Sequence, residues 1–379
     1  TNSYNTAVGA DAGLAVTTGV ENTIIGGLAG DALTAGFENV VVGKSALTTD
    51  TLGRGSTALG YATLFNQNFT TATTTQNTAV GYYAGVSITT GVENTLIGSL
   101  AGDALTDADR NVAVGVEALS ADTLGSNSVA IGPLALNNQN FTTATNTYNT
   151  AVGANAGTAV TTATQNTLIG GLSGDAFTDG AANTALGFET LTADTRGNNA
   201  VALGHHALST QNFTTTTASY NVAVGSQAGL SVTTGIENTI IGGLAGDALT
   251  DSDYNVAVGA GALSADTLGS TSVAIGFQTL LAQNFTTATN TFNVAVGYQA
   301  GKAVTTGVRN TLIGGLAGDA FTDADHNIAI GFAALSNDTL GSRSTAIGQS
   351  ALLAQNFTTA TDVYNTAVGY FAGGSVTTG

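Results

Sequence analysis

The decapeptide YNTAVGADAG occupies residues 4–13, and near-copies of it begin at Tyr148, Tyr220 and Tyr364. The numbers of these starting residues differ by multiples of 72. A fixed period of this kind is typical of repeat architectures, in which each unit is a small piece of secondary structure that stacks on its neighbours. The period therefore decides the class of fold before any single side chain is considered.

A five-residue motif recurs inside every copy: Asn or Ser, any residue, an apolar residue, an aliphatic residue and Gly. It occurs 21 times, with Ala200 at the first position in one case, and its spacing follows a cycle of 17, 17, 17 and 21. We call each stretch from one motif to the next a turn, and number its positions from the first residue of the motif. The cycle predicts one continuous array over residues 1–379, with super-repeats 5–76, 77–148, 149–220, 221–292 and 293–364 and a partial one at 365–379.

Each turn reads as a strand and its connection. Gly, Thr and Val are frequent, whereas Leu, Glu and Lys at helical spacing are missing. Positions 2–4 are rich in β-branched residues and are closed by glycine, which is typical of a short strand. We therefore predict an all-β fold, a parallel β-solenoid (β-roll) of about 21 turns that stack about 4.8 Å apart.

Two positions of the motif predict backbone features. Position 5 is Gly in all 21 turns, beginning with Gly9, Gly26, Gly43, Gly60 and Gly81. An invariant glycine indicates a backbone that needs a positive φ or has no room for a Cβ atom. Position 1 is Asn in 16 turns, which predicts a ladder of stacked amides that the fourth turn of each cycle interrupts.

The two faces of the predicted strand are both apolar. Positions 2 and 4 share one face, and position 3, which is usually Ala, points to the other. Strands that are apolar on both faces are typically buried on both. Because a single solenoid covers only one face of each strand, we expect the small Ala face to pack against neighbouring chains, in a homotrimer or a polymer.

Composition excludes several classes of protein. The net charge is −18 with only seven scattered Lys and Arg residues, so nucleic acid is a poor partner. There is no cysteine for a disulfide or thiolate metal site, and no run of 18 uncharged apolar residues that predicts a membrane span. Because the sequence begins and ends inside a repeat, we expect a segment of a longer fibre.

Aspartates recur at two places in the cycle, and neither pattern predicts catalysis. One set follows GGLAG or a variant of it and departs from the calcium β-roll spacing, so we favour turn-capping aspartates over calcium ligands. This set comprises Asp31, Asp103, Asp175, Asp247 and Asp319. The other set precedes Thr in DTLG or DTRG, and we expect turn aspartates on a solvated edge. It comprises Asp50, Asp122, Asp194, Asp266 and Asp338.

No constellation of reactive side chains recurs through the array. The three histidines, His205, His206 and His326, do not repeat between cycles, and we interpret them as surface variation. No Ser/His/Asp set recurs and there is no phosphate-binding glycine loop. We therefore expect neither an enzyme nor a cofactor.

The fourth turn of each cycle carries four extra residues, first in FNQNFTTATTTQ at 65–76. We expect a polar loop with an exposed Phe that contacts a host-surface glycan or receptor, or another fibre. Its Asn-Phe-Thr is a glycosylation sequon in a secreted eukaryotic protein, but it has no such meaning in a bacterial or phage protein, which is the interpretation we favour. The sequon asparagines are Asn68, Asn140, Asn212, Asn284 and Asn356.

The motif resembles that of known fibrous proteins. NSVAIG at 127–132 and TSVAIG at 271–276 resemble the head repeats of YadA-like trimeric autotransporter adhesins. NTAVGYYAG at 77–85 and NTAVGYFAG at 365–373 resemble repeats of phage tail-fibre shafts. The resemblance implies trimers of left-handed parallel β-rolls. Although the cycle of longer units departs from the adhesin pattern, we expect a non-catalytic section of an extracellular fibre at a cell surface or on a virion.

Two other classes stay open. A self-assembling extracellular filament or matrix protein would have the same repeat. An ice-binding solenoid is less favoured, because a regular Thr-x-Thr on every turn is lacking.

Overall fold

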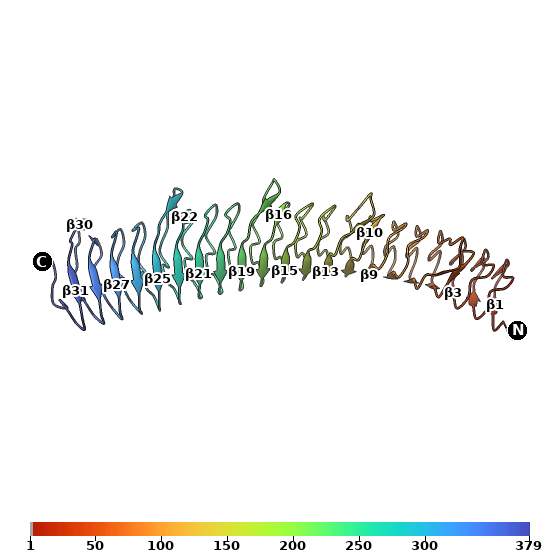
Figure 1. The fold of residues 1–379 in the computed structure, drawn as a ribbon, viewed down its shortest axis with the longest axis horizontal. Helices are drawn as coiled ribbons and strands as arrows, with labels where there is room; N and C mark the ends of the chain where they lie inside the picture. Colours follow the sequence, from red (N-terminus) through yellow and green to blue (C-terminus); the bar gives the residue numbers. More distant parts are fainter. Residues whose placement is uncertain (1–2) are drawn as a thin grey trace. The chain divides into compact units, whose positions relative to one another are not determined.

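The computed structural model describes residues 3–379, which fall into two compact units, 3–186 and 187–379. In each unit, consecutive turns of the chain lie side by side, and each turn contributes one short strand at positions 2–4 (Figure 1). No helix occurs within residues 3–379, so no segment there could cross a membrane as a helix. The prediction of an all-β parallel β-solenoid of about 21 turns is confirmed.

The strands at positions 2–4 follow the motif without exception. In the first unit they are β1 (Thr6–Val8), β2 (Thr23–Ile25), β3 (Val40–Val42), β5 (Thr57–Leu59), β7 (Thr78–Val80), β8 (Thr95–Ile97), β9 (Val112–Val114), β11 (Val129–Ile131), β13 (Thr150–Val152), β14 (Thr167–Ile169) and β15 (Thr184–Leu186). In the second unit they are β17 (Val201–Leu203), β19 (Val222–Val224), β20 (Thr239–Ile241), β21 (Val256–Val258), β23 (Val273–Ile275), β25 (Val294–Val296), β26 (Thr311–Ile313), β27 (Ile328–Ile330), β29 (Thr345–Ile347) and β31 (Thr366–Val368).

Neighbouring strands within each unit pair in parallel and in register. In the pair β7 and β8, for example, Thr78 lies opposite Thr95 and Val80 opposite Ile97. Because equal positions of successive turns face one another, each position of the motif forms a continuous row along the stack. A row of identical or similar side chains is therefore the basic surface feature of this molecule.

Short strands connect the third and fourth turns of each cycle. Each pair is parallel and joins the end of the third turn to the extra residues of the fourth. The pairs are β4 (Gly53–Arg54) with β6 (Thr73–Thr74), β10 (Gly125–Ser126) with β12 (Thr145–Asn146), β16 (Gly197–Asn198) with β18 (Thr217–Ala218), β22 (Gly269–Ser270) with β24 (Thr289–Asn290), and β28 (Gly341–Ser342) with β30 (Thr361–Asp362).

The interior of the solenoid is lined by position 3, which corrects the expectation that the Ala face packs against other chains. Ala113 and Ala257 are fully buried, whereas Ile97 and Ile241 at position 4 are 39% and 38% exposed. Position 3 faces the closed interior of each turn, where both the small Ala113 and the larger Leu96 are fully buried. The larger aliphatic side chains of positions 2 and 4 point outward.

Core side chains of different size alternate to fill this interior. In the second turn of a cycle, position 3 carries a large side chain, such as Leu96. It packs against two glycines at position 9, Gly85 of the preceding turn and Gly102 of its own turn. A Cβ atom on either glycine would lie 2.7 Å from a methyl group of Leu96. In the third and fourth turns the sizes are exchanged, with Ala at position 3 (Val41 in the first cycle) and a buried leucine, such as Leu119, at position 9. This complementarity contributes to the four-turn period.

The invariant glycine at position 5 meets both predicted requirements. Gly98 has a φ of +137°, a conformation that L-residues rarely adopt. A Cβ atom at this residue would lie 2.7 Å from the carbonyl carbon of Gly115 in the next turn. The corner therefore stacks directly on the next corner, backbone against backbone.

The asparagine ladder at position 1 runs through the backbone. Asn94 donates its backbone N–H to Oδ1 of Asn77 at 2.9 Å, and its Nδ2 donates to the carbonyl of Ala108 at 2.8 Å. The amide-to-amide contact with Asn77 is longer, at 3.3 Å. Each buried amide thus connects neighbouring turns through backbone groups that need a hydrogen-bond partner inside the solenoid.

Candidate functional site

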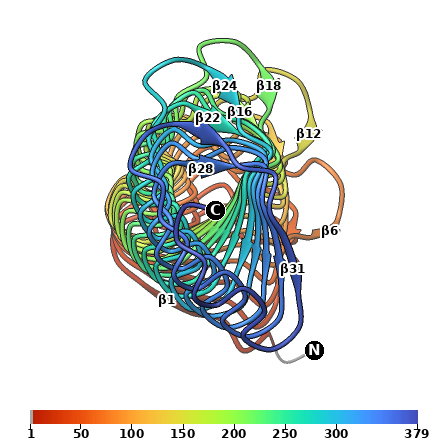
Figure 2. The same ribbon diagram turned by 90° about the vertical axis from the view of Figure 1, so that its left-hand side faces the viewer.

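The enlarged loops are the first feature that interrupts the regular surface. We use this name for the last twelve residues of the fourth turn of each cycle, 65–76, 137–148, 209–220, 281–292 and 353–364. Figure 2 shows the loops that contain β6, β12, β18 and β24 extending beyond the outline of neighbouring turns. Each loop is fastened to the preceding turn by its short parallel strand pair.

The phenylalanine of the loop is an anchor, which corrects the expectation of an exposed ring. Phe69, Phe141, Phe213 and Phe285 are only 5–7% exposed, and Phe357 is half-buried. In all five loops the backbone N–H of this residue donates to a buried carboxylate of the preceding turn, which fixes the backbone that carries the ring. The exposed part of the loop is instead the threonine-rich stretch that follows.

The buried carboxylate belongs to the DTLG aspartates, which we expected on a solvated edge. All five are fully buried, so that expectation is wrong. Asp122 Oδ1 accepts from the backbone N–H groups of Gly125 at 3.1 Å and Phe141 at 3.0 Å, and Oδ2 accepts from Nε2 of Gln139 at 2.6 Å. The carboxylate lies inside because these three donors replace water around it.

The loop glutamine supplies the amide that the fourth turn lacks. Ser128 occupies the asparagine position and accepts from Gln139 Nε2 at 2.8 Å, while Gln139 Oε1 accepts from Nδ2 of Asn149 at 2.8 Å. The ladder of amides therefore continues through Gln139 into the next cycle. The hydrogen bonds of Gln139 explain why one turn both lacks Asn at position 1 and carries the extra residues, because the loop glutamine replaces the missing amide.

Desolvation dominates the electrostatics of this cluster. Burial raises the pKa of the Asp50, Asp122 and Asp194 carboxyls, and the hydrogen bonds from the loop glutamine and the backbone oppose that rise. The three donors to Asp122 are all neutral groups, two backbone amides and one side-chain amide. The cluster has the composition of a structural polar core and not of a paired-carboxylate catalytic site.

Sequence reasoning did not find this cluster, although position 12 carried a signal. This position is Val or Ile in the first turn, Leu or Phe in the second, Asp in the third and Gln in the fourth, in every cycle. A position that is apolar in two turns, acidic in the third and an amide in the fourth, always in this order, indicates a row of side chains that face the interior. In such a row the acid and the amide of neighbouring turns come into contact. The pairing became clear only when the register brought Asp122 and Gln139 together.

The GGLAG-type aspartates recur once per cycle, and the charged neighbours of Asp31, Asp103 and Asp319 are Asp11, Glu117 and Lys302 respectively. In Asp31, Asp103, Asp247 and Asp319 the Oδ1 atom is buried without a hydrogen-bond partner, and burial raises the pKa of each carboxyl. Within residues 3–379 no three acidic or histidine side chains gather as metal ligands.

The histidines lie at separate places on the second unit. The ring of His205 stacks on Phe188 at 5.9 Å, and Nδ1 of His206 lies 3.3 Å from Oε2 of Glu189. His326 lies beside Arg309, in a different cycle, at 3.3 Å. The two places form no common site, in line with the irregular occurrence of histidine in the sequence.

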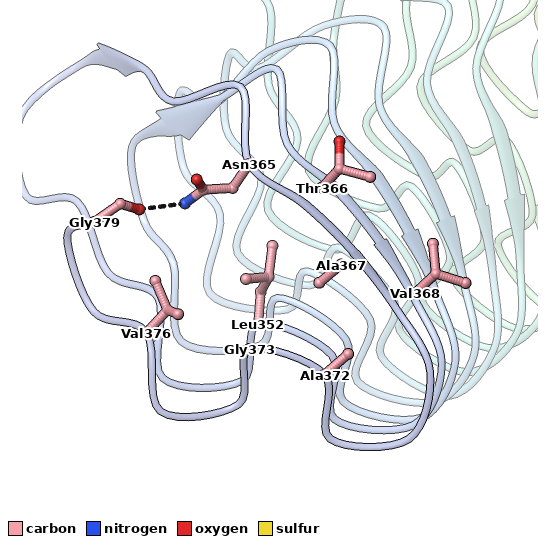
Figure 3. A pocket seen from close by; sticks show the side chains of 9 residues that line it. All are labelled: Leu352, Asn365, Thr366, Ala367, Val368, Ala372, Gly373, Val376 and Gly379. Carbon is pink, nitrogen blue, oxygen red and sulfur yellow. Dashed lines mark hydrogen bonds between the residues drawn. The ribbon is translucent and has the colours of Figure 1, made fainter.

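A pocket of about 500 Å³ opens at the last turn of the second unit (Figure 3). Its lining includes Leu352, Ala367, Ala372 and Val376, which belong to the interior rows of the solenoid. In earlier turns the next turn covers the same positions, as at the fully buried Val304. The pocket is thus the core of the solenoid seen end on, and its lining contains no charged side chain.

An aliphatic band is the second feature of the surface. We use this name for the row of Val, Ile and Leu at position 4 together with the neighbouring side chains of position 2, which are Thr in 12 turns and Val or Ile in the others; neither position carries a charge in any of the 21 turns. In the second unit the position 4 row is aliphatic from Leu203 to Val368, and Ile241, Ile275 and Ile313 are each 38% exposed. A row of partly exposed aliphatic side chains without charge is a candidate contact surface.

Stacked aromatic rings lie at position 6, next to the glycine corner that ends the band. Tyr61 stacks on Tyr82 with ring centroids 5.5 Å apart, and Phe277 stacks on Tyr298 at 5.7 Å. In both pairs the rings face one another along the stack. They extend the apolar surface past the corner.

Comparison with known proteins adds no assignment to these features. No protein-family model matches the chain, and no curated protein matches it significantly.

Proposed function

We propose that this chain is a non-catalytic structural and adhesive section of an extracellular fibre, in which three copies pack through their aliphatic bands. The observation that carries this proposal is the uninterrupted, uncharged and partly exposed row of Ile, Val and Leu at position 4. The resemblance of the motif to trimeric adhesin heads and tail-fibre shafts supports the number three.

Charge favours the band as the contact face. The chain has a net charge of −18, so most approaches between copies bring carboxylates together. The band has no charged residue at positions 2 and 4, and its burial stabilises a contact by roughly 25 cal/mol for each Å² of apolar surface removed from water. A ring of three chains covers every band, whereas an open array leaves a band free at its ends.

The enlarged loops supply the adhesive part of the proposal. They recur once in every four-turn cycle, and the buried phenylalanine and the strand pair hold each of them in place. The exposed threonines offer hydroxyl groups that suit a polar partner such as a host-surface glycan or receptor. A regular series of such loops gives many weak contacts at once, which raises the overall affinity.

Single cysteines test the contact, since the natural chain has none. The Ile241→Cys chain is expected to react slowly with a maleimide and to form interchain disulfides in dilute solution. The Thr215→Cys chain, altered in an exposed part of an enlarged loop, is the control and is expected to react at once. Equal and rapid labelling of the two cysteines would exclude the band as an interface. Ile275→Cys repeats the test at a second site of the same row.

A self-assembling filament or matrix protein is the second candidate, because an open array would bury the same band. The filament hypothesis also predicts that the cysteines in the band react slowly with maleimide, but in assemblies whose size grows with protein concentration.

A further inference from the structure

We propose that the enlarged loops are built to accept Asn-linked sugars at their sequon asparagines, Asn68, Asn140, Asn212, Asn284 and Asn356. This inference concerns a modification and stands apart from the proposed association of chains. It reverses the preference stated from the sequence, for reasons that lie in the geometry of the loop.

The first reason is that the fold does not require asparagine at this place. The residue occupies position 13, which is Thr in the other 16 turns. There the threonine hydroxyl typically donates to the carbonyl of the next turn, as Thr106 does to Thr123 at 3.0 Å. Asparagine thus replaces threonine in all five enlarged loops and in no other turn.

The second reason is that the asparagine side chain makes only a redundant contact. Asn140 Oδ1 accepts from the hydroxyl of Thr123 at 3.2 Å, but the same hydroxyl already donates to the carbonyl of Phe141 at 2.8 Å. The equivalent contacts of the other loops are 3.0–3.4 Å long. A residue that recurs five times without a structural demand indicates another use.

The third reason is the state of the amide nitrogen and of the sequon hydroxyl. Nδ2 of Asn140 makes no hydrogen bond to any residue of 3–379, and the side chain is exposed, as in three of the other loops; Asn68 is half-buried. Thr142, two residues further on, is exposed as well. Between them Phe141 is buried and holds the backbone, so that the amide and the hydroxyl needed for recognition are both offered to solvent.

The chemistry needs one co-reactant, a sugar activated as a diphosphate. The Asn Nδ2 atom forms a bond to the anomeric carbon as the bond from that carbon to the phosphate oxygen breaks. The diphosphate leaves with the bonding electrons, and one Nδ2 proton passes to a base. No oxidation or reduction takes place, and the chain serves only as the acceptor.

A sixth sequon in the same sequence provides an internal contrast. Asn337 is followed by Asp338 and Thr339, and this triplet does not recur in the other cycles. Its middle residue is a fully buried aspartate, and the hydroxyl of Thr339 donates to the carbonyl of Phe357 at 2.8 Å. The sequon hydroxyl is engaged here, so we expect this site to stay unmodified in the folded chain.

The test uses the purified, folded full chain with UDP-glucose and a soluble glycosyltransferase that adds one hexose to Asn-x-Ser/Thr. Intact mass and peptide mapping are expected to show five added hexoses, one on each enlarged loop, and none on Asn337. Asn140→Gln and Thr142→Val should each remove one hexose. Asn138→Gln, a change at an exposed asparagine of the same loop outside any sequon, should leave all five.

Three outcomes would contradict the proposal. In the first, the folded chain accepts no sugar but a tryptic digest of the same chain does, which would show that the folded loop hides its asparagine. In the second, neither the folded chain nor its digest accepts sugar, which would show that the sequence around the asparagine is not an acceptor. Equal modification of Asn337 in the folded chain would contradict the argument from geometry.

Discussion

Corner residues with a positive φ shape every turn of the solenoid. Many are not glycine, such as Leu119 with a φ of +55° and Leu136 with +48°. A non-glycine residue in this region costs about 1–2 kcal/mol. Hydrogen bonds between turns offset the cost, since Leu119 donates to the carbonyl of Ala135 at 3.0 Å and Leu136 to that of Ala156 at 3.0 Å.

At the position 5 corner, only glycine meets the requirements of the backbone. We expect Gly98→Ala to lower the free energy of unfolding by about 3 kcal/mol, from backbone strain together with the clash against Gly115. Gly55→Ala is the control, because Gly55 has a φ of +73° but a Cβ atom there would have no neighbour within 4 Å. It should cost about 1 kcal/mol. Urea denaturation of both variants checks the difference, and equal losses would refute the role of stacking.

The third cycle lacks one member of the buried polar cluster, and restoring it should stabilise the fold. Ala200 stands where the other cycles have a serine that accepts from the loop glutamine, at 2.8 Å in Gln283 to Ser272. We expect Ala200→Ser to raise the free energy of unfolding by about 1 kcal/mol. Ser272→Ala should lower it by at least as much, because it leaves buried donors unpaired. A loss of stability in Ala200→Ser, measured with urea, would contradict this account of the cluster.

At the scale of the element, the third and fourth turns of a cycle act as a pair. The aspartate of one and the glutamine of the other meet in the interior, and the short strands fasten the enlarged loop outside. The loop is therefore part of the core as much as of the surface. A partner bound at the loop tip would therefore contact a segment that is fixed to the solenoid at both ends.

The buried aspartates of these pairs make stability depend on pH in an unusual direction. Burial raises the pKa of Asp50, Asp122 and Asp194 above the ordinary value of 3.8, so folding favours their protonated form. The resulting stability is fully present below 3.8 and is lost as the pH rises through the raised value. We expect a higher free energy of unfolding at about pH 4 than at about pH 7. A fall on acidification, measured with urea at the two pH values, would contradict this expectation.

The sequence predicted the strands but not which way they face. Alternation placed positions 2 and 4 on one side and position 3 on the other, and both sides were apolar, so burial could not be assigned from the pattern. Only the closed turn shows that position 3 lies inside, where Ala113 and Leu96 are both fully buried, while Ile97 at position 4 points outward. Likewise, the burial of Asp122 depends on Gln139, which lies one full turn later in the chain and meets it only through the register.

At the scale of the whole molecule, stability should follow from matched neighbours. Deletion of 77–148 removes one full cycle and joins the fourth turn to another first turn, so every contact keeps its type. Deletion of 77–93 removes one turn, and Leu64 then replaces Gly85 next to Leu96, where a Cβ atom alone would lie 2.7 Å from a methyl group. We expect the first variant to unfold cooperatively, and the second to lose about 1–3 kcal/mol through overpacking. Circular dichroism during urea denaturation compares them, and equal stability would contradict the alternating core.

We propose that the outward aliphatic band makes copies of the chain associate. The central claim is that three copies bury their bands against one another, and the solution mass tests it most directly. Light scattering on the purified chain should give a value near three times 37.3 kDa, unchanged on dilution. A mass of 37.3 kDa would show that the band is exposed to water in the native state, and the account of the fibre would then be wrong.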